Sequence, residues 1–397
     1  MSTMLSVSFV KLLTRGSQHH VPVLSAVRCI SSKHSADVSR PAPYPYKERD
    51  FRFPWTAMED TEDRLNENSK IIVVEGPIAS GKTEFCKKLA DELDMLALPP
   101  ANMDMWYKQG DFDFRSLDHL WSTENMKSFD EKSFCKDPKH LNTMGFQIRM
   151  LQLRFSLYVD ALAHMLSTGQ GVVLQRSPFS DFVFVEAMDS AGYISKRVKD
   201  IYNEILQFTM LPLLKPHLVI YLDIPPSIVK ENIKKRNNPW EVNSPILNDT
   251  YLNKIEEVYK NKYLPNINNH SELLVYDWSE GGDVEVVVED IERIDFDHYD
   301  HFSDKLREWR ELTTKEWNEK REIFADQKQD LMMQFNTIER YDAPELYYTG
   351  DETLEYIQKL GNVPEYYYQK GFNPEKNSVL WRFDIDKKQR FPTMFFY

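Results

Sequence analysis

The sequence predicts an α/β fold in which helices cover both faces of a five-stranded, doubly wound parallel sheet. Two observations support this prediction. Short runs rich in β-branched and apolar residues alternate with helical segments along the middle of the chain. The first run leads into a glycine-containing loop, and an apolar stripe with helical spacing follows that loop. The predicted strands are 70–75, 95–98, 172–174, 218–222 and 273–276.

The helical pattern is clearest over 142–166, where a long apolar stripe ends just before a threonine–glycine pair. Glycine in this place commonly ends a helix. Further helical segments are expected near 181–214 and 226–262, between the later strands. Residues 99–141 are polar and irregular, and they carry no pattern that predicts their structure.

Composition excludes several classes of protein. The chain has 397 residues, 42% of them hydrophobic, and no apolar stretch long enough to span a bilayer. Its 49 basic and 62 acidic residues give a net charge of −13, which argues against a general nucleic-acid binder. The three cysteines form no paired spacing, which excludes a disulfide scaffold and a zinc ribbon.

The N-terminal segment resembles a mitochondrial transit peptide. Residues 1–36 contain four basic residues, many serines and no acidic residue. We expect cleavage near Ile30, so that 1–30 is the transit peptide. A disordered basic tail is the alternative, and a secretory signal is disfavoured because basic residues interrupt the apolar stretches. The following segment, 31–69, contains four closely spaced prolines over 41–54 and predicts an extended arm lying on a surface.

The character of the chain changes after the last predicted strand. Apolar residues at intervals of three, four or seven predict one long amphipathic helix over 296–340. The final segment, 341–397, has fourteen aromatic residues among its 57 positions and four prolines. Aromatic side chains anchor protein interfaces, so contact with another protein is the favoured interpretation. The alternative is that this segment packs back on the domain.

The loop after the first strand matches the phosphate-binding pattern G-x-x-x-x-G-K-[ST] over its full length, 76–83. Its glycines let backbone N–H groups approach phosphate oxygens, and the helix that follows adds its positive N-terminal end. The lysine supplies a charge to the terminal phosphates, and the threonine hydroxyl suits magnesium. Pro77 removes one N–H group from the loop. The predicted nucleotide-binding residues here are Gly76, Ser80, Gly81, Lys82 and Thr83.

With this loop, the segment 70–295 resembles the deoxyribonucleoside kinase family. Gln147 stands where a glutamine of the family hydrogen-bonds the nucleobase edge, and 175–181 matches the family's (Asp/Glu)-Arg-Ser segment. The basic residues 234–236 occupy the place of the family's arginine-rich lid. Taken alone, the glutamine could be interpreted as an exposed helix residue and the arginine of 175–181 as part of a surface ion pair. The occurrence of these motifs together and in the family's order is much more specific than any one of them. The resemblance implies a P-loop kinase-like fold, with a nucleotide bound by Gln147, Arg176, Asp181 and Arg236.

The same resemblance indicates that the catalyst is missing. The family uses a glutamate after the second strand as the base and an acid before the Arg-Ser pair to hold magnesium. Here Pro100 occupies the first position and Gln175 the second. Asp104 or Glu186 are the nearest substitutes, and this substitution is disfavoured. We therefore expect no catalytic residue and no metal site.

Within the family, the segments 169–174 and 180–188 resemble a branch that serves as an accessory subunit of mitochondrial NADH:ubiquinone oxidoreductase, complex I. Phe182 stands where active members carry an arginine. The resemblance implies a non-catalytic, peripheral subunit on the matrix side of the inner membrane. It would contact a membrane-arm core subunit and support assembly or stability of that arm.

No cofactor is required by this interpretation. The sequence has no cysteine cluster and no GxGxxG after a strand, so we expect no FAD, FMN or iron–sulfur cluster, and no nucleic acid partner. A bound deoxynucleotide is compatible with the retained loop. The alternatives are an active mitochondrial deoxyribonucleoside kinase and another P-loop kinase of small molecules.

Overall fold

The computed structural model describes residues 40–363, apart from 53, 110, 111, 300, 301, 311 and 362. The predicted transit peptide, 1–30, and the aromatic segment beyond 363 lie outside the described residues. Within the described part, no helix combines the length and the apolar character needed to cross a bilayer.

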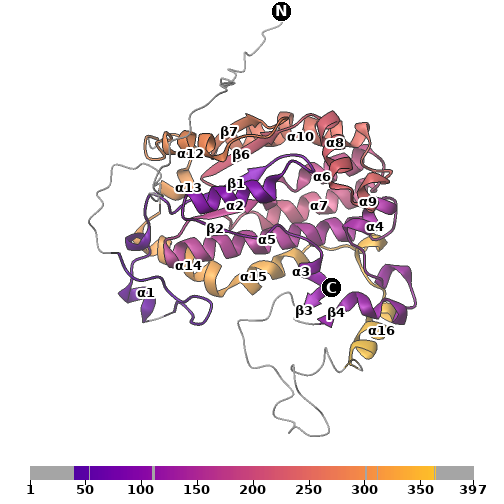
Figure 1. Cartoon of the computed structure of the whole chain (residues 1–397). Helices are drawn as coiled ribbons and strands as arrows, with labels where there is room; N and C mark the ends of the chain where they lie inside the picture. Colours follow the sequence, from indigo (N-terminus) through magenta and orange to yellow (C-terminus); the bar gives the residue numbers. More distant parts are fainter. Residues whose placement is uncertain are drawn as a thin grey trace, which may run out of the picture.

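The centre of the molecule is the predicted five-stranded parallel sheet (Figure 1). All five residues of the central strand β1 are buried, as expected for a parallel sheet covered on both faces. A separate two-stranded antiparallel ribbon lies in the region that the sequence left unpredicted. The strand order β2-β5-β1-β6-β7 uses β1 (Ile71–Glu75), β2 (Leu96–Ala97), β5 (Val172–Gln175), β6 (Leu218–Asp223) and β7 (Glu272–Asp277), and the ribbon pairs β3 (Lys108–Gln109) with β4 (Phe112–Asp113).

Helices cover the sheet on both sides. The connection through α2 (Lys82–Glu92) runs from β1 outward to β2, whereas the connection through α5 (Thr143–Thr168) runs back from β2 to β5. Right-handed crossovers in opposite directions place these two helices on opposite faces. The remaining helices of the core are α3 (Asp104–Tyr107), α4 (Glu131–Lys136), α6 (Phe182–Ser190), α7 (Lys196–Thr209), α8 (Pro226–Arg236), α9 (Pro239–Val242), α10 (Asp249–Val258), α11 (Leu264–Asn268) and α12 (Val284–Glu292).

The predicted end of α5 is confirmed. Gly169 follows the helix with φ 81°, in the left-handed region that favours glycine. A Cβ at this position would lie 2.2 Å from the carbonyl oxygen of Arg64, so the residue must also be small. The glycine therefore stops the helix and lets the N-terminal segment pass close to it.

The C-terminal part is helical, but the prediction of a single helix over 296–340 is wrong. This segment instead contains three α-helices, α13 (Arg307–Arg310), α14 (Thr314–Asp326) and α15 (Lys328–Met333). Thr313 and Glu316 form a reciprocal capping box at which a new helix begins. The spacing of apolar residues continues across this break and therefore does not predict it. Helices α14 and α15 both contact α5 (Figure 1).

Beyond α15 the described chain packs back on the domain. Helix α16 (Gly350–Gly361) stacks Tyr356 on Trp121 with ring centroids 5.4 Å apart, and the Ser122 backbone N–H donates to Glu355 at 3.0 Å. Residues 341–363 thus follow the alternative interpretation of this segment. Contact of residues 364–397 with another protein stays a prediction.

The N-terminal segment 40–69 packs on the C-terminal helices. It contains the short α-helix α1 (Trp55–Met58) and a single 3₁₀ turn (Glu62–Arg64), and Tyr44 and Phe51 are both buried. The guanidinium of Arg321, from α14, lies 3.6 Å from the ring centroid of Phe51 and 4.6 Å from that of Tyr44. The backbone N–H of Phe51 also donates to Asp326 at 2.6 Å. The N-terminal segment and α14 therefore meet on one side of the domain.

Candidate nucleotide-binding site

The phosphate loop connects β1 to α2, and its two glycines have conformations that only glycine adopts easily. Gly76 has φ 144°, and a Cβ there would lie 2.7 Å from the carbonyl oxygen of Leu222. Gly81 has φ 78° and precedes the first turn of α2. The backbone thus curls around the N-terminus of the helix, where N–H groups and the helix dipole favour an anion.

Lys82 is folded into the loop rather than exposed to solvent. Only 4% of its surface is accessible. Its Nζ donates to Ser80 Oγ at 2.7 Å and to the carbonyl oxygen of Pro77. Burial lowers the pKa of this ammonium well below its usual range, and the nearby Arg176 lowers it further. A phosphate in the loop would favour the charged form and oppose this shift.

A cavity of about 260 Å³ opens beside the loop and gathers residues from distant parts of the sequence. Of the sequence-predicted residues, Lys82, Gln147, Arg176 and Arg236 line it, together with Gln175. The remaining wall is largely apolar and aromatic, which suits a flat ring system. It includes Phe134, Phe146, Met150, Phe184, Met188, Trp240 and Tyr251.

Asp181 does not line this cavity. It is fully buried, and its Oδ2 accepts from Gln147 Nε2 at 2.9 Å and from the Tyr202 hydroxyl at 2.6 Å. Its Oδ1 accepts from Arg154, which is itself a wall residue of the cavity. The Asp181 carboxylate therefore holds Gln147 and Arg154 in place from the side away from the cavity. In this geometry it does not itself face a nucleotide in the cavity.

Two arginines share one aromatic platform in the cavity. The guanidinium groups of Arg154 and Arg176 lie 5.0 and 4.8 Å from the ring centroid of Phe184. Arg176 also donates to the carbonyl oxygen of Gly76 at 3.2 Å, which links it to the phosphate loop. Because Asp181 balances the charge of Arg154, Arg176 is the arginine that makes the wall next to the loop attractive to an anion.

Hydrogen bonds restrain the segment that the sequence predicts as a lid. Arg236, at the end of α8, donates to Glu241 at 2.5 Å. Glu241 is buried and accepts a second hydrogen bond from Asn238 at 3.0 Å. The lid arginine therefore faces the cavity with part of its charge already balanced.

Comparison with known proteins identifies the family of the chain. The family model described as deoxynucleoside kinase matches residues 72–314. The chain belongs to the deoxynucleoside kinase family.

Three relatives are similar to the chain to different extents. The protein named NADH dehydrogenase (ubiquinone) 1 alpha subcomplex subunit 10, mitochondrial, is 34% identical in Mus musculus, over 80% of this chain and 84% of that protein. In Bos taurus it is 32% identical, over 80% and 88%. Deoxyguanosine kinase of Dictyostelium discoideum is 28% identical, over 60% of this chain and 74% of that protein.

A solved structure of M. mycoides deoxyadenosine kinase with bound dATP also resembles the chain. The two share 18% identity with a TM-score of 0.41, over 56% of this chain and 96% of the other.

The two carboxylates considered as substitute catalysts lie outside the cavity of this deoxynucleoside kinase domain. Asp104 pairs with Lys108 and Arg115, each at 2.7 Å, and the hydrogen bond from Lys108 is the main reason that its pKa is lowered. Glu186 pairs with Lys199 and Lys262. Burial raises the pKa of Glu186, but the two lysines outweigh this effect and lower it overall. Neither group is placed or tuned to act as a base on a ligand in the cavity.

The side chains at the position where a kinase binds magnesium are poorly suited to that ion. Thr83 Oγ1 donates to Gln175 Oε1 at 2.7 Å, so the two side chains at this position bond to each other. In such sites magnesium is usually bound by one or two carboxylates together with the phosphates of the substrate, and here a hydroxyl and a neutral amide stand where a carboxylate is expected. Among the described residues, no group of three histidine, cysteine or acidic side chains is arranged to hold a metal.

Sequence reasoning missed both carboxylates that line the cavity, Glu241 of the lid segment and Glu131. Glu131, the first residue of α4, lines the cavity and accepts from the Met103 backbone N–H at 2.9 Å. Burial raises its pKa above the usual range. The only sequence signal was a helix start, since Asp130 caps α4 by accepting from Ser133 N–H.

Proposed function

We propose that this chain is a non-catalytic accessory subunit of mitochondrial complex I that keeps the nucleotide-binding cavity of its kinase ancestors. The observation that carries the proposal is the hydrogen bond between Thr83 and Gln175, which occupies the place where an active kinase needs an acid. Pro100 at the expected base position supports the same conclusion. The choice of complex I as the assembly rests on the relatives named as its subunits, which are 32–34% identical to this chain.

In this function the protein lies on the matrix side of the inner membrane and stabilises the membrane arm. Helix α16 offers a surface for the contact, because Leu354 and Ile357 lie one turn apart and are 55% and 62% exposed. Replacing both by serine should release the protein from complex I on native gels without lowering its own melting temperature. The matched control is Asp351→Ser on the same helix, which should leave the protein in the complex.

A nucleotide in the cavity would act structurally. A ligand at 100 times its dissociation constant adds about 2.7 kcal/mol to the free energy of unfolding. Deoxynucleotides should therefore raise the melting temperature of the purified protein, and Lys82→Met should remove the effect. If no deoxynucleotide raises it, the cavity is not a nucleotide site.

The second candidate is an active mitochondrial deoxyribonucleoside kinase, and Glu131 favours it. This carboxylate faces the cavity, and its raised pKa brings it closer to that of a base working near neutral pH. Kinases of this chemistry turn over at about 1–100 s⁻¹. Turnover of a deoxynucleoside with ATP and magnesium at such a rate, lost in Glu131→Gln, would establish the kinase and overturn the accessory-subunit proposal. Native-gel migration of the endogenous protein with complex I, together with absent turnover, would establish the first.

A further inference from the structure

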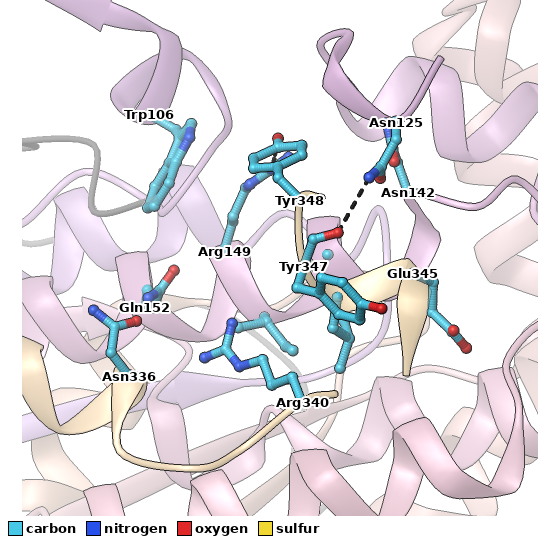
Figure 2. A pocket seen from close by; sticks show the side chains of 13 residues that line it. Trp106, Asn125, Asn142, Arg149, Gln152, Asn336, Arg340, Glu345, Tyr347 and Tyr348 are labelled. Atoms are coloured by element: carbon cyan, nitrogen blue, oxygen red, sulfur yellow. Dashed lines mark hydrogen bonds between the residues drawn. The ribbon is translucent and has the colours of Figure 1, made fainter. Parts of the chain in front are cut away.

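A second cavity lies between α5 and residues 336–348, here called the C-terminal extension, away from the phosphate loop (Figure 2). Arg149 and Gln152 of α5 line one side, and Asn336 and Arg340 of the extension line another. None of these residues lines the nucleotide cavity. The enclosed volume is about 70 Å³, several times the roughly 10–15 Å³ that one water needs, so a single phosphate-sized group fits.

The cavity has more hydrogen-bond donors than the surrounding protein uses. Gln152 is only 7% exposed, yet within the described part of the chain its amide makes no hydrogen bond. Asn336 Nδ2 and Trp106 Nε1, from the same wall, are buried and also lack an acceptor among the described residues. Buried polar groups nearly always have a partner, so these groups point to a ligand rich in acceptors.

Positive charge is concentrated at the same place. Arg149 donates only long hydrogen bonds, of 3.4 Å, to two tyrosine hydroxyl groups. Arg340 donates to the carbonyl oxygen of Phe335 at 2.5 Å. Neither guanidinium forms an ion pair with an acidic residue of the described chain, and burial lowers the pKa of Arg340, as expected for a cation without an anionic neighbour.

One acidic residue, Glu345, belongs to the cavity wall. Figure 2 shows it across the cavity from Gln152 and Asn336, with its carboxylate turned away. That carboxylate accepts from Ser195 Oγ at 3.1 Å, which holds it outward. It therefore leaves the positive side of the cavity open to an anion.

A larger hollow of about 470 Å³ adjoins the cavity and shares Asn336 and Arg340 with it. Tyr341, Tyr356 and Ile357 also line it. An anion held at Arg340 thus has room for an attached organic group on this aromatic side.

We propose that this cavity binds the phosphate group of a phosphate ester. The guanidinium groups of Arg149 and Arg340 and the amides of Gln152 and Asn336 hold the oxygens, and the organic part of the ester lies in the larger hollow. Four side chains approach from two sides, which suits a tetrahedral phosphate better than a planar carboxylate. The ester is either a soluble metabolite or a phospholipid headgroup.

The test uses the full chain carrying Lys82→Met, so that the phosphate loop contributes little binding. Titration calorimetry with glycerol 3-phosphate should show saturable binding that Arg340→Gln weakens at least tenfold. Gln152→Leu should weaken it as well, and this variant should fold because the amide it removes has no partner in the described structure. The matched control is Arg293→Gln, at the exposed arginine that follows α12, and this variant should bind like its parent.

Sedimentation with phosphatidylcholine vesicles, with and without phosphatidic acid, distinguishes the two sources. Co-sedimentation that needs phosphatidic acid and is lost in Gln152→Leu identifies a lipid phosphate. Binding of glycerol 3-phosphate without co-sedimentation identifies a soluble ester. If neither probe binds, or if both bind Arg340→Gln and Gln152→Leu as tightly as the parent, the proposal is wrong.

Discussion

The contact between Arg321 and Phe51 should stabilise the junction of the N-terminal segment with α14 through a buried cation–π interaction. Both side chains are fully buried, and the guanidinium lies 3.6 Å from the ring centroid. Burial lowers the pKa of Arg321 to about 10, with a further contribution from Arg64, so the side chain stays charged at neutral pH. Glu59 is an ion-pair partner of Arg321 at 3.5 Å. A desolvated cation–π pair contributes about 2 kcal/mol.

A double-mutant cycle measures this contribution. Phe51→Leu keeps an apolar side chain but removes the aromatic face, and Arg321→Met keeps the length of the side chain but removes the charge. We expect the coupling between the two substitutions to be about 1–2 kcal/mol in the free energy of unfolding. Urea unfolding followed by circular dichroism gives the four values.

The single substitutions should differ in size. Phe51→Leu should destabilise the protein by roughly 1–3 kcal/mol from lost packing and lost cation–π attraction. Arg321→Met should have a smaller effect, because an apolar side chain relieves the desolvation of a guanidinium whose nitrogens lack hydrogen-bond partners among the described residues. Additivity within about 0.5 kcal/mol would show that the ring and the cation do not interact, and would refute the reasoning.

Three further predictions concern the kinase domain. Asp181→Asn should destabilise the protein by about 3–5 kcal/mol in urea unfolding, because it leaves Arg154 buried without its counter-charge; an effect below 1 kcal/mol would contradict this. Gln175→Glu should make nucleotide binding magnesium-dependent, since it places a carboxylate beside Thr83, and calorimetry with and without EDTA would detect the change. Gly76→Ala should lower the unfolding free energy by about 1–3 kcal/mol and abolish nucleotide binding, through strain at φ 144°; a stable variant that still binds would be evidence against the loop geometry.

The sheet and the phosphate loop could be predicted from sequence because their signals are local. A buried parallel strand is a short apolar run, and the loop is a fixed pattern in which Gly76 and Gly81 have conformations that favour glycine. The region 99–141 gave no such signal, because its backbone forms short 3₁₀ turns and capped single turns, and aromatic packing holds it in place. Glu131 was missed for this reason. Its place in the cavity depends on tertiary structure.

The remaining differences between prediction and structure arise where spacing along the chain does not show how deeply a residue is buried. Asp181 follows Arg176 in the motif, yet the turn between them directs the arginine into the cavity and the aspartate into the core. In the C-terminal part, apolar residues recur at helical intervals across the break between α14 and α15, because both of these helices contact α5. The capping box at Thr313 marks an earlier break, before α14, but a threonine three residues before a glutamate is too common a pair to outweigh the periodicity.

The burial of Lys82 should make nucleotide binding depend on pH. In the free protein its pKa is well below the usual range, first because the ammonium is desolvated and second because Arg176 is near. Bound phosphates stabilise the charged form and raise this pKa. Below the lowered pKa, the lysine is charged with or without ligand, and the affinity does not vary through this group.

Above that pKa, binding must take up a proton, so the affinity should fall as pH rises, by up to about tenfold per pH unit, until the pKa of the bound state is reached. Calorimetry at one pH in two buffers of different ionisation enthalpy measures the proton directly, and the heats should differ. Lys82→Met supplies the control, because any residual binding should give the same heat in both buffers. Equal heats for the unmodified protein across this pH range would mean that Lys82 keeps its charge inside the loop, and that the Pro77 carbonyl and Ser80 hydroxyl already compensate its burial.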